Sequence, residues 1–148
     1  MVRLTLPSLA FLPLVAIAGA AQLPRADREW SVETAPPVVV KTSPEAGATD
    51  VDPRLGQIRV TFSKPMLVSS WSWVKVSDAT YPESQDKPRF ESDRRTCTLP
   101  VNLHPGKTYV IWINDARSQG FVDQNRTPAV PYLLVFQTRA RSATKVRR

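Results

Sequence analysis

The sequence of 148 residues has almost none of the side chains that most often carry chemistry, with one cysteine, Cys97, and one histidine, His104. A lone cysteine cannot form a disulfide within the chain, and these two residues are too few for a zinc site. Cys97 lies in a strand-like run, which predicts a small apolar core side chain, with an intermolecular disulfide as the alternative. A small Cys/His hydrolase would require a hydrogen bond between Cys97 and His104. We expect no catalytic residues, no metal and no cofactor.

Helical periodicity and glycine-rich phosphate-binding loops are also lacking. Instead, the chain contains 14 prolines and short runs of alternating or β-branched residues. This pattern predicts an all-β protein, an Ig-like antiparallel β-sandwich of about seven strands. The sequence has no Cys-Trp-Cys spacing, which excludes an antibody-type domain. The expected strands cover residues 38–41, 57–63, 70–77, 88–91, 96–101, 107–114 and 132–138.

The N-terminal segment resembles a secretory signal. Arg3 precedes the uncharged, mostly apolar residues 4–18, and small residues at 18–21 offer a cleavage site. Residues 1–21 are therefore predicted to be a cleavable signal peptide of a secreted, periplasmic or envelope-associated protein. The alternative is a retained membrane anchor, although two prolines interrupt a run that is short for a membrane span. We expect no transmembrane segment in the mature chain.

Downstream of the signal, residues 22–36 mix charges and prolines and are predicted to be a linker, followed by the Ig-like domain at residues 37–138. The formal net charge is +7, but residues 36–138 carry 12 basic and 10 acidic residues, and the last ten residues carry five positive charges and no negative one. Residues 139–148 are therefore predicted to be a basic, disordered tail. The tail is an alternative binding element for anionic envelope polymer, and its lack of aromatic residues argues against specific nucleic-acid binding.

Several short motifs occur in a fixed order. Ser43-Pro44 is followed by a small-residue turn, then by Phe62-Ser63-Lys64-Pro65-Met66, Leu103-His104-Pro105-Gly106-Lys107-Thr108-Tyr109, Phe121-Val122-Asp123 and Phe136-Gln137-Thr138. In this order the chain resembles the SbsA-type bacterial Ig-like domains. The resemblance implies an exported spacer, adhesion or partner domain without shared catalytic residues. The family usually has a glycine shortly after the Phe-x-Asp aspartate. This chain has none there, so we expect Asn125 to adopt positive φ.

Loop aspartates are the remaining candidates for ligand chemistry. Asp50 and Asp52, or Asp115 and Asp123, could supply oxygen ligands to calcium. Loop aspartates more often cap turns through hydrogen bonds to the following backbone. We therefore expect no metal at either pair.

The most distinctive expectation is an apolar solvent-facing surface. In an Ig-like sandwich the strands at 70–77, 107–114 and 132–138 share one sheet. Alternation would turn Val74, Val76, Tyr109, Ile111, Ile113, Leu134 and Phe136 inward, and Trp71, Trp73, Val110, Trp112, Leu133 and Val135 outward. Six large apolar side chains on a solvent face indicate a contact surface for a protein or glycan partner, or for self-association. Two alternatives remain, because the linker or the loop 115–131 could cover this face, or a one-residue slip could invert it.

Overall fold

The computed structural model describes residues 30–141. The predicted signal peptide, the first part of the predicted linker and residues 142–148 of the tail lie outside this range. The described chain forms eight strands: β1 (Val39–Ser43), β2 (Gln57–Phe62), β3 (Trp73–Lys75), β4 (Glu83–Ser84), β5 (Arg89–Phe90), β6 (Thr96–Asn102), β7 (Thr108–Ile113) and β8 (Tyr132–Gln137).

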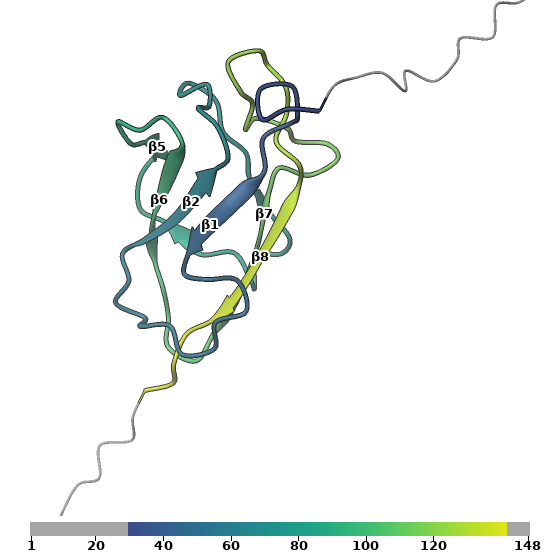
Figure 1. Cartoon of the computed structure of the whole chain (residues 1–148). Coiled ribbons are helices and arrows are strands. Elements are labelled where there is room, and N and C mark those ends of the chain that lie inside the picture. The colour runs from purple at the N-terminus through teal and green to yellow at the C-terminus, as the bar shows by residue number, and fades with distance from the viewer. Residues whose placement is uncertain (1–29, 142–148) are drawn as a thin grey trace, which may run out of the picture.

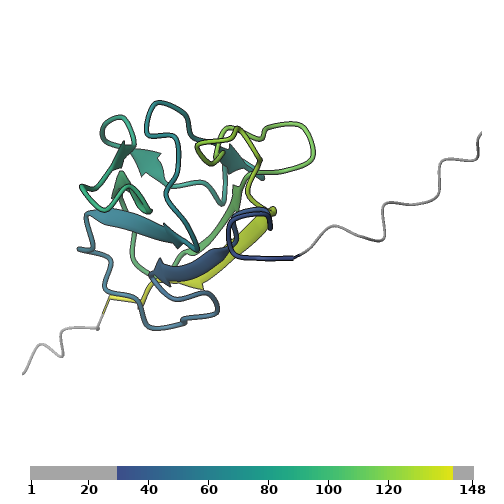
Figure 2. The same ribbon diagram turned by 45° about the horizontal axis from the view of Figure 1, so that its top comes forward.

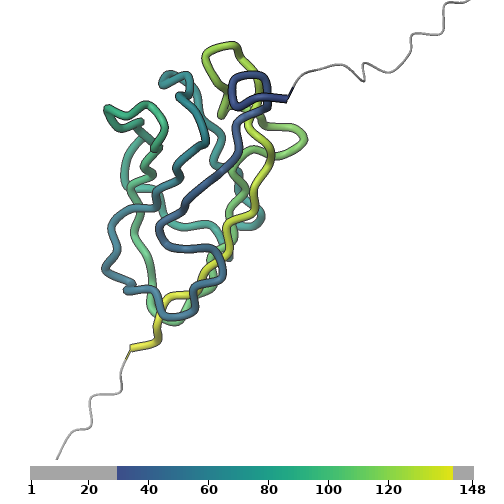
Figure 3. The backbone as a smooth tube through the Cα atoms, in the orientation of Figure 1, coloured from purple at the N-terminus to yellow at the C-terminus, as the bar shows by residue number. Residues whose placement is uncertain are grey.

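The strands pack as two antiparallel sheets, which confirms the predicted β-sandwich (Figures 1 and 2). One sheet has the order β1-β2-β6-β4, with β5 also paired to β6, and the other has the order β3-β7-β8. The three strands expected to share a sheet do so. No helix occurs in residues 30–141, so this part of the chain contains none that could cross a bilayer. The two ends of the described chain leave from opposite poles of the sandwich (Figure 3).

Alternating side chains build the core between the sheets. In β2, Ile58, Val60 and Phe62 are fully buried, whereas the residues between them are only half-buried. Tyr109 and Ile111 in β7 are equally buried, and they lie opposite Phe136 and Leu134 of β8. The inward side chains of this alternating pattern are the main source of stability, because burial of apolar area contributes about 25 cal/mol per Å².

The outer edge of β8 is covered by the chain that connects β1 to β2. Gly47 N donates to Val135 O at 2.7 Å, Gln137 N donates to Ala48 O at 2.7 Å, and Val51 forms a parallel bridge with Thr138. These bonds satisfy backbone groups that would otherwise offer an open strand edge to another chain.

The turn between β6 and β7 is fixed from both sides at the pole where the C-terminus leaves. His104 N donates to Tyr109 Oη at 2.7 Å, so this tyrosine holds its own turn as tyrosine corners do in Ig-like domains. Thr138 Oγ1 donates to His104 O at 2.6 Å and accepts from Lys107 N at 3.0 Å. The Leu-x-Pro-Gly-x-x-Tyr and Phe-x-Thr motifs therefore support the fold at this pole.

Candidate interaction site

An apolar block lies on the outer face of the β3-β7-β8 sheet. Val110 is paired with Val135 across β7 and β8, and Trp112 is paired with Leu133. None of these four residues belongs to the core cluster or packs against it, and Leu133 is 39% exposed. The outer block, as we call it, comprises these four residues and Val74, which β3 places beside Trp112.

The expected outward orientation of Trp71 and Trp73 is wrong. Trp73 is paired with Ile113, which points into the core, and its ring meets the ring of Phe121 edge-on at 5.6 Å. Both tryptophans pack against the core. The slip that we considered as an alternative therefore occurs, but only in the β3 region.

The same slip reverses the valines of this segment. Val74, expected to face inward, occupies the outer face, and Val76, also expected inward, is 51% exposed just beyond the end of β3. The physical reason is volume, because the Trp73 indole fills the space beside the Phe121 ring better than a valine would.

The second part of the predicted linker is anchored at one pole by Lys64. Its Nζ donates to Glu33 O at 2.9 Å and to Ala35 O at 2.5 Å, and lies 3.6 Å from Asp123 Oδ2. The side chains of this ion pair are only 11% and 4% exposed. Lys64 thus ties the entering chain to the sandwich at a position that the sequence reasoning missed. The signal was a lysine inside the Phe-Ser-Lys-Pro-Met motif.

The loop 115–131 has its own anchor in Asn114. This residue is fully buried with φ of 56°, a left-handed conformation that asparagine tolerates better than most residues. Its Nδ2 donates to Phe121 O at 2.9 Å and Ala129 O at 3.0 Å, and its Oδ1 accepts from Phe121 N at 2.9 Å. The loop therefore inserts Phe121 into the core, where this ring also lies 5.0 Å from that of Phe62.

The turn that follows Phe121 differs from the expectation in one residue. Positive φ, 62°, occurs at Arg126 and not at Asn125. The reason is Asp123, whose Oδ1 accepts from the backbone N of Asn125 at 2.8 Å and of Thr127 at 2.9 Å. These two bonds fix Asn125 in the turn and move the left-handed residue one position along.

Cys97 and His104 do not form a catalytic pair. Cys97 is fully buried, and burial raises the pKa of its thiol to about 12, an effect that the neighbouring Trp73 indole opposes only in part. His104 is exposed, and its Nε2 lies 3.4 Å from Glu83 Oε1 on β4. A protonated, buried thiol is a poor nucleophile.

The loop aspartates cap turns or pair with arginines. Asp115 Oδ1 accepts from the backbone N of Arg117 at 2.8 Å and of Ser118 at 2.6 Å. Asp52 pairs with Arg54 at 2.9 Å, and hydrogen bonds from Arg54 lower the pKa of its carboxyl to about 2. Across residues 30–141, no group of three or more acidic, histidine or cysteine side chains could hold a metal ion.

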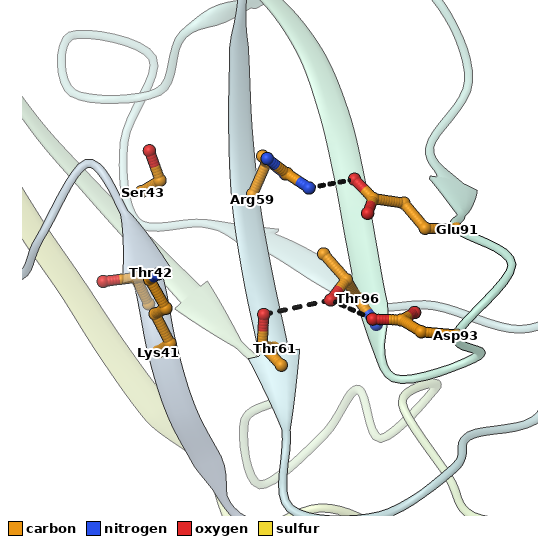
Figure 4. A pocket seen from close by; sticks show the side chains of 8 residues that line it. All are labelled: Lys41, Thr42, Ser43, Arg59, Thr61, Glu91, Asp93 and Thr96. Carbon is orange, nitrogen blue, oxygen red and sulfur yellow. Dashed lines mark hydrogen bonds and ion pairs between the residues drawn. The ribbon is translucent and has the colours of Figure 1, made fainter.

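A polar groove of about 350 Å³ lies on the opposite sheet from the outer block (Figure 4). The Arg59 guanidinium extends toward Glu91 and forms an ion pair with it, and Glu91 also accepts from Thr98 Oγ1 at 3.3 Å. The sequence did not indicate this groove, because its polar residues resemble ordinary solvent-facing residues of strands and turns. All of its lining side chains are polar: Lys41, Thr42, Ser43, Arg59, Thr61, Glu91, Asp93 and Thr96.

The comparison with family models agrees with this architecture. A family model described as a bacterial Ig-like domain matches residues 33–138. No curated protein matches the chain. A solved structure, the crystal structure of the S-layer protein rSbsC(31-844), is similar with a TM-score of 0.43 and 20% identity. That similarity covers 70% of this chain and 14% of the S-layer chain.

Proposed function

The chain belongs to the bacterial Ig-like domain family, and from that premise we propose that it is a non-catalytic interaction module at the cell envelope or outside the cell. Among domains of this family, we place it with the SbsA type, on the order of its motifs from Ser43-Pro44 to Thr138. The motif residues with visible contacts, such as Lys64, Tyr109 and Thr138, hold the fold together. We therefore look for the partner surface outside the motifs.

The observation that carries the proposal is the outer block. Solvent faces of antiparallel sheets normally alternate with polar residues, so a face with Trp112 among four aliphatic side chains departs from the usual pattern. A tryptophan offers a large rigid area at a small cost in side-chain entropy, which suits a protein interface or a sugar-stacking platform. We propose the outer block as the contact surface for a protein or glycan partner, or for a second copy of the chain.

A binding experiment tests this surface. The purified domain, the variant Trp112→Ser and the control Val40→Ser would each be titrated onto isolated bacterial envelopes and analysed for self-association by sedimentation. Val40 is 59% exposed on β1 of the other sheet, so the control replaces an exposed apolar side chain by serine outside the outer block. We expect loss of binding or association only for Trp112→Ser. Equal behaviour of both variants would contradict the assignment.

Export and domain organisation complete the proposal. We propose that residues 1–21 are removed as a signal peptide and that the remaining chain is secreted or stays at the envelope. Ends that leave from opposite poles suit a spacer placed in line between two other segments (Figure 3). N-terminal sequencing of the exported protein tests the cleavage, and a mature chain that begins with residue 1 would exclude it.

A second candidate function rests on the segregation of charge. Four of the five positive charges of the last ten residues follow residue 140, at Arg141, Lys145, Arg147 and Arg148. Arg139 belongs to the folded part, where its Nε lies 3.7 Å from Asp50 Oδ1. Deleting residues 141–148 should abolish binding to anionic envelope polymer if the tail is the binding element, and that binding should fall steeply with salt. Retained, salt-insensitive binding would favour the outer block.

A further inference from the structure

The polar groove on the β1-β2-β6 sheet has two walls of opposite charge. Its floor consists of side chains from β2 and β6, with Thr61 and Thr96 sharing a hydrogen bond of 3.1 Å. Lys41 and Ser43 stand on β1 at one side, and Glu91 and Asp93 stand beyond β5 at the other (Figure 4). With Arg59 on the floor, the lining carries two positive and two negative side chains, so the groove is polarised but has no net charge.

Part of this polar surface is satisfied internally. Asp93 accepts from the backbone N of Arg95 and of Thr96, each at 2.9 Å, and from Thr96 Oγ1 at 2.7 Å. Glu91 Oε1 accepts from Arg59 and Thr98. These bonds hold the acidic wall rigidly in place and leave its carboxylates able to accept further hydrogen bonds from a ligand.

The cationic side has groups that remain to be satisfied. Arg59 Nε is buried and has no hydrogen-bond partner among residues 30–141. A donor without a partner is costly, and the Arg59 side chain remains 42% exposed, so an acceptor that enters the groove gains a hydrogen bond from this guanidinium. Within the same described range, Lys41 has neither an ion pair nor a side-chain hydrogen bond. A ligand that fits must therefore present an acceptor, preferably an anionic one, to Arg59 and Lys41.

We propose that this groove binds an acidic sugar unit of the uronic-acid class. The carboxylate accepts from the Arg59 guanidinium and Lys41 Nζ, and ring hydroxyls donate to Glu91 and bond with the hydroxyls of Ser43 and Thr61. The volume of about 350 Å³ lies at the lower end of ordinary ligand pockets, which suits a single sugar ring. This site is separate from the outer block and goes beyond the function proposed above.

Other ligand chemistries suit the groove less well. A neutral sugar leaves Lys41 without an anionic partner. A phosphate places about two negative charges near Glu91 and Asp93, and like charges at such short range repel. An amino acid is less favoured because its ammonium group would need Glu91 as its acceptor, and Glu91 already pairs with Arg59. The lining has no aromatic side chain for stacking. Affinity therefore comes from polar contacts alone and falls in the millimolar range.

The test is a titration of the isotope-labelled domain followed by NMR, with glucuronate, glucose, glutamate and inorganic phosphate as separate probes. We expect saturable shifts of resonances from β1, β2 and residues 91–96 with glucuronate, and at least about tenfold weaker binding of each other probe. Lys41→Ala should weaken glucuronate binding about tenfold and leave glucose unchanged. The control Lys87→Ala removes an exposed lysine outside the groove and should change neither.

Each contrary outcome is distinct. Absence of saturable shifts, shifts outside the groove, or equal glucuronate binding by Lys41→Ala would overturn the site. Phosphate or glutamate binding as tight as glucuronate would replace the acidic sugar with a simple anion or an amino acid. Trp112→Ser should bind glucuronate normally, so failure of this proposal is independent of failure of the outer block.

Discussion

Replacing Trp73 and Trp112 one at a time should give very different losses of stability, although both are tryptophans in neighbouring strands. Trp73 packs against the core and contacts the Phe121 ring, so Trp73→Ala leaves a cavity. Truncation of a core aromatic costs about 3 to 5 kcal/mol, and partial exposure places this case near about 3 kcal/mol. Trp112 is half-buried on the outer face. Half of the area gain of a fully buried aromatic corresponds to about 1 kcal/mol for Trp112→Ala.

The assay is urea unfolding of both variants and the wild type, followed by far-ultraviolet circular dichroism so that the loss of an indole does not change the probe. With a slope of about 1 to 2 kcal/mol per molar urea, the difference of about 2 kcal/mol separates the two midpoints by about 1 to 2 M. A loss below about 1 kcal/mol for Trp73→Ala would refute the inward orientation of β3. A loss for Trp112→Ala as large as that for Trp73→Ala would refute the solvent-facing position of the outer block.

Three further predictions concern the anchors of the fold and the buried thiol. Asn114→Ala removes three hydrogen bonds to loop backbone and should cost about 3 kcal/mol in urea unfolding, and a loss below about 1 kcal/mol would contradict this role. Lys64→Met leaves Asp123 buried without its cationic partner and should cost about 3 kcal/mol or more. Lys75→Met, which breaks the exposed ion pair with Asp78, should cost at most about 1 kcal/mol, and similar losses for the two variants would refute the anchoring role of Lys64. The folded-state pKa of Cys97, about 12, exceeds that of an unfolded thiol, so its contribution to stability is complete at neutral pH and declines once the unfolded thiol ionises. Between pH 8 and 10 the wild type should therefore lose about 2 kcal/mol relative to Cys97→Ala, and a constant difference would show that the thiol is accessible.

The sequence predicts the long strands well and the short ones poorly. In β2, β7 and β8 the residues of one parity are apolar and, apart from the half-buried Tyr132, fully buried in the structure, so alternation assigns the faces correctly. In the segment 70–77 both parities carry apolar side chains, as they also do in β7 and β8, but here the regular strand is too short to keep one parity inward along the whole segment. β3 is only three residues long, and residues 70–72 before it form no regular strand. The two-residue strand β4 has no sequence pattern at all.

The candidate site shows the same limit. Four of the six predicted surface residues lie together on the outer face because β7 and β8 are regular, whereas Trp71 and Trp73 follow the slip in β3. The Lys64–Asp123 ion pair and the polar groove depend on residues that are far apart in the chain. Their proximity is set by packing and not by the local sequence pattern. The motifs that indicated the family consist of residues that hold the fold together.

The most direct test of the central claim is ¹⁹F NMR of the domain with all four tryptophans replaced by 5-fluorotryptophan, recorded free and with bacterial envelopes or a purified partner. The resonances would be assigned by single Trp-to-Phe variants. We predict that the Trp112 resonance responds to solvent in the free domain and shifts or broadens on binding, while the Trp71 and Trp73 resonances stay unchanged. Binding that leaves the Trp112 resonance unchanged would contradict the assignment of the outer block as the contact surface.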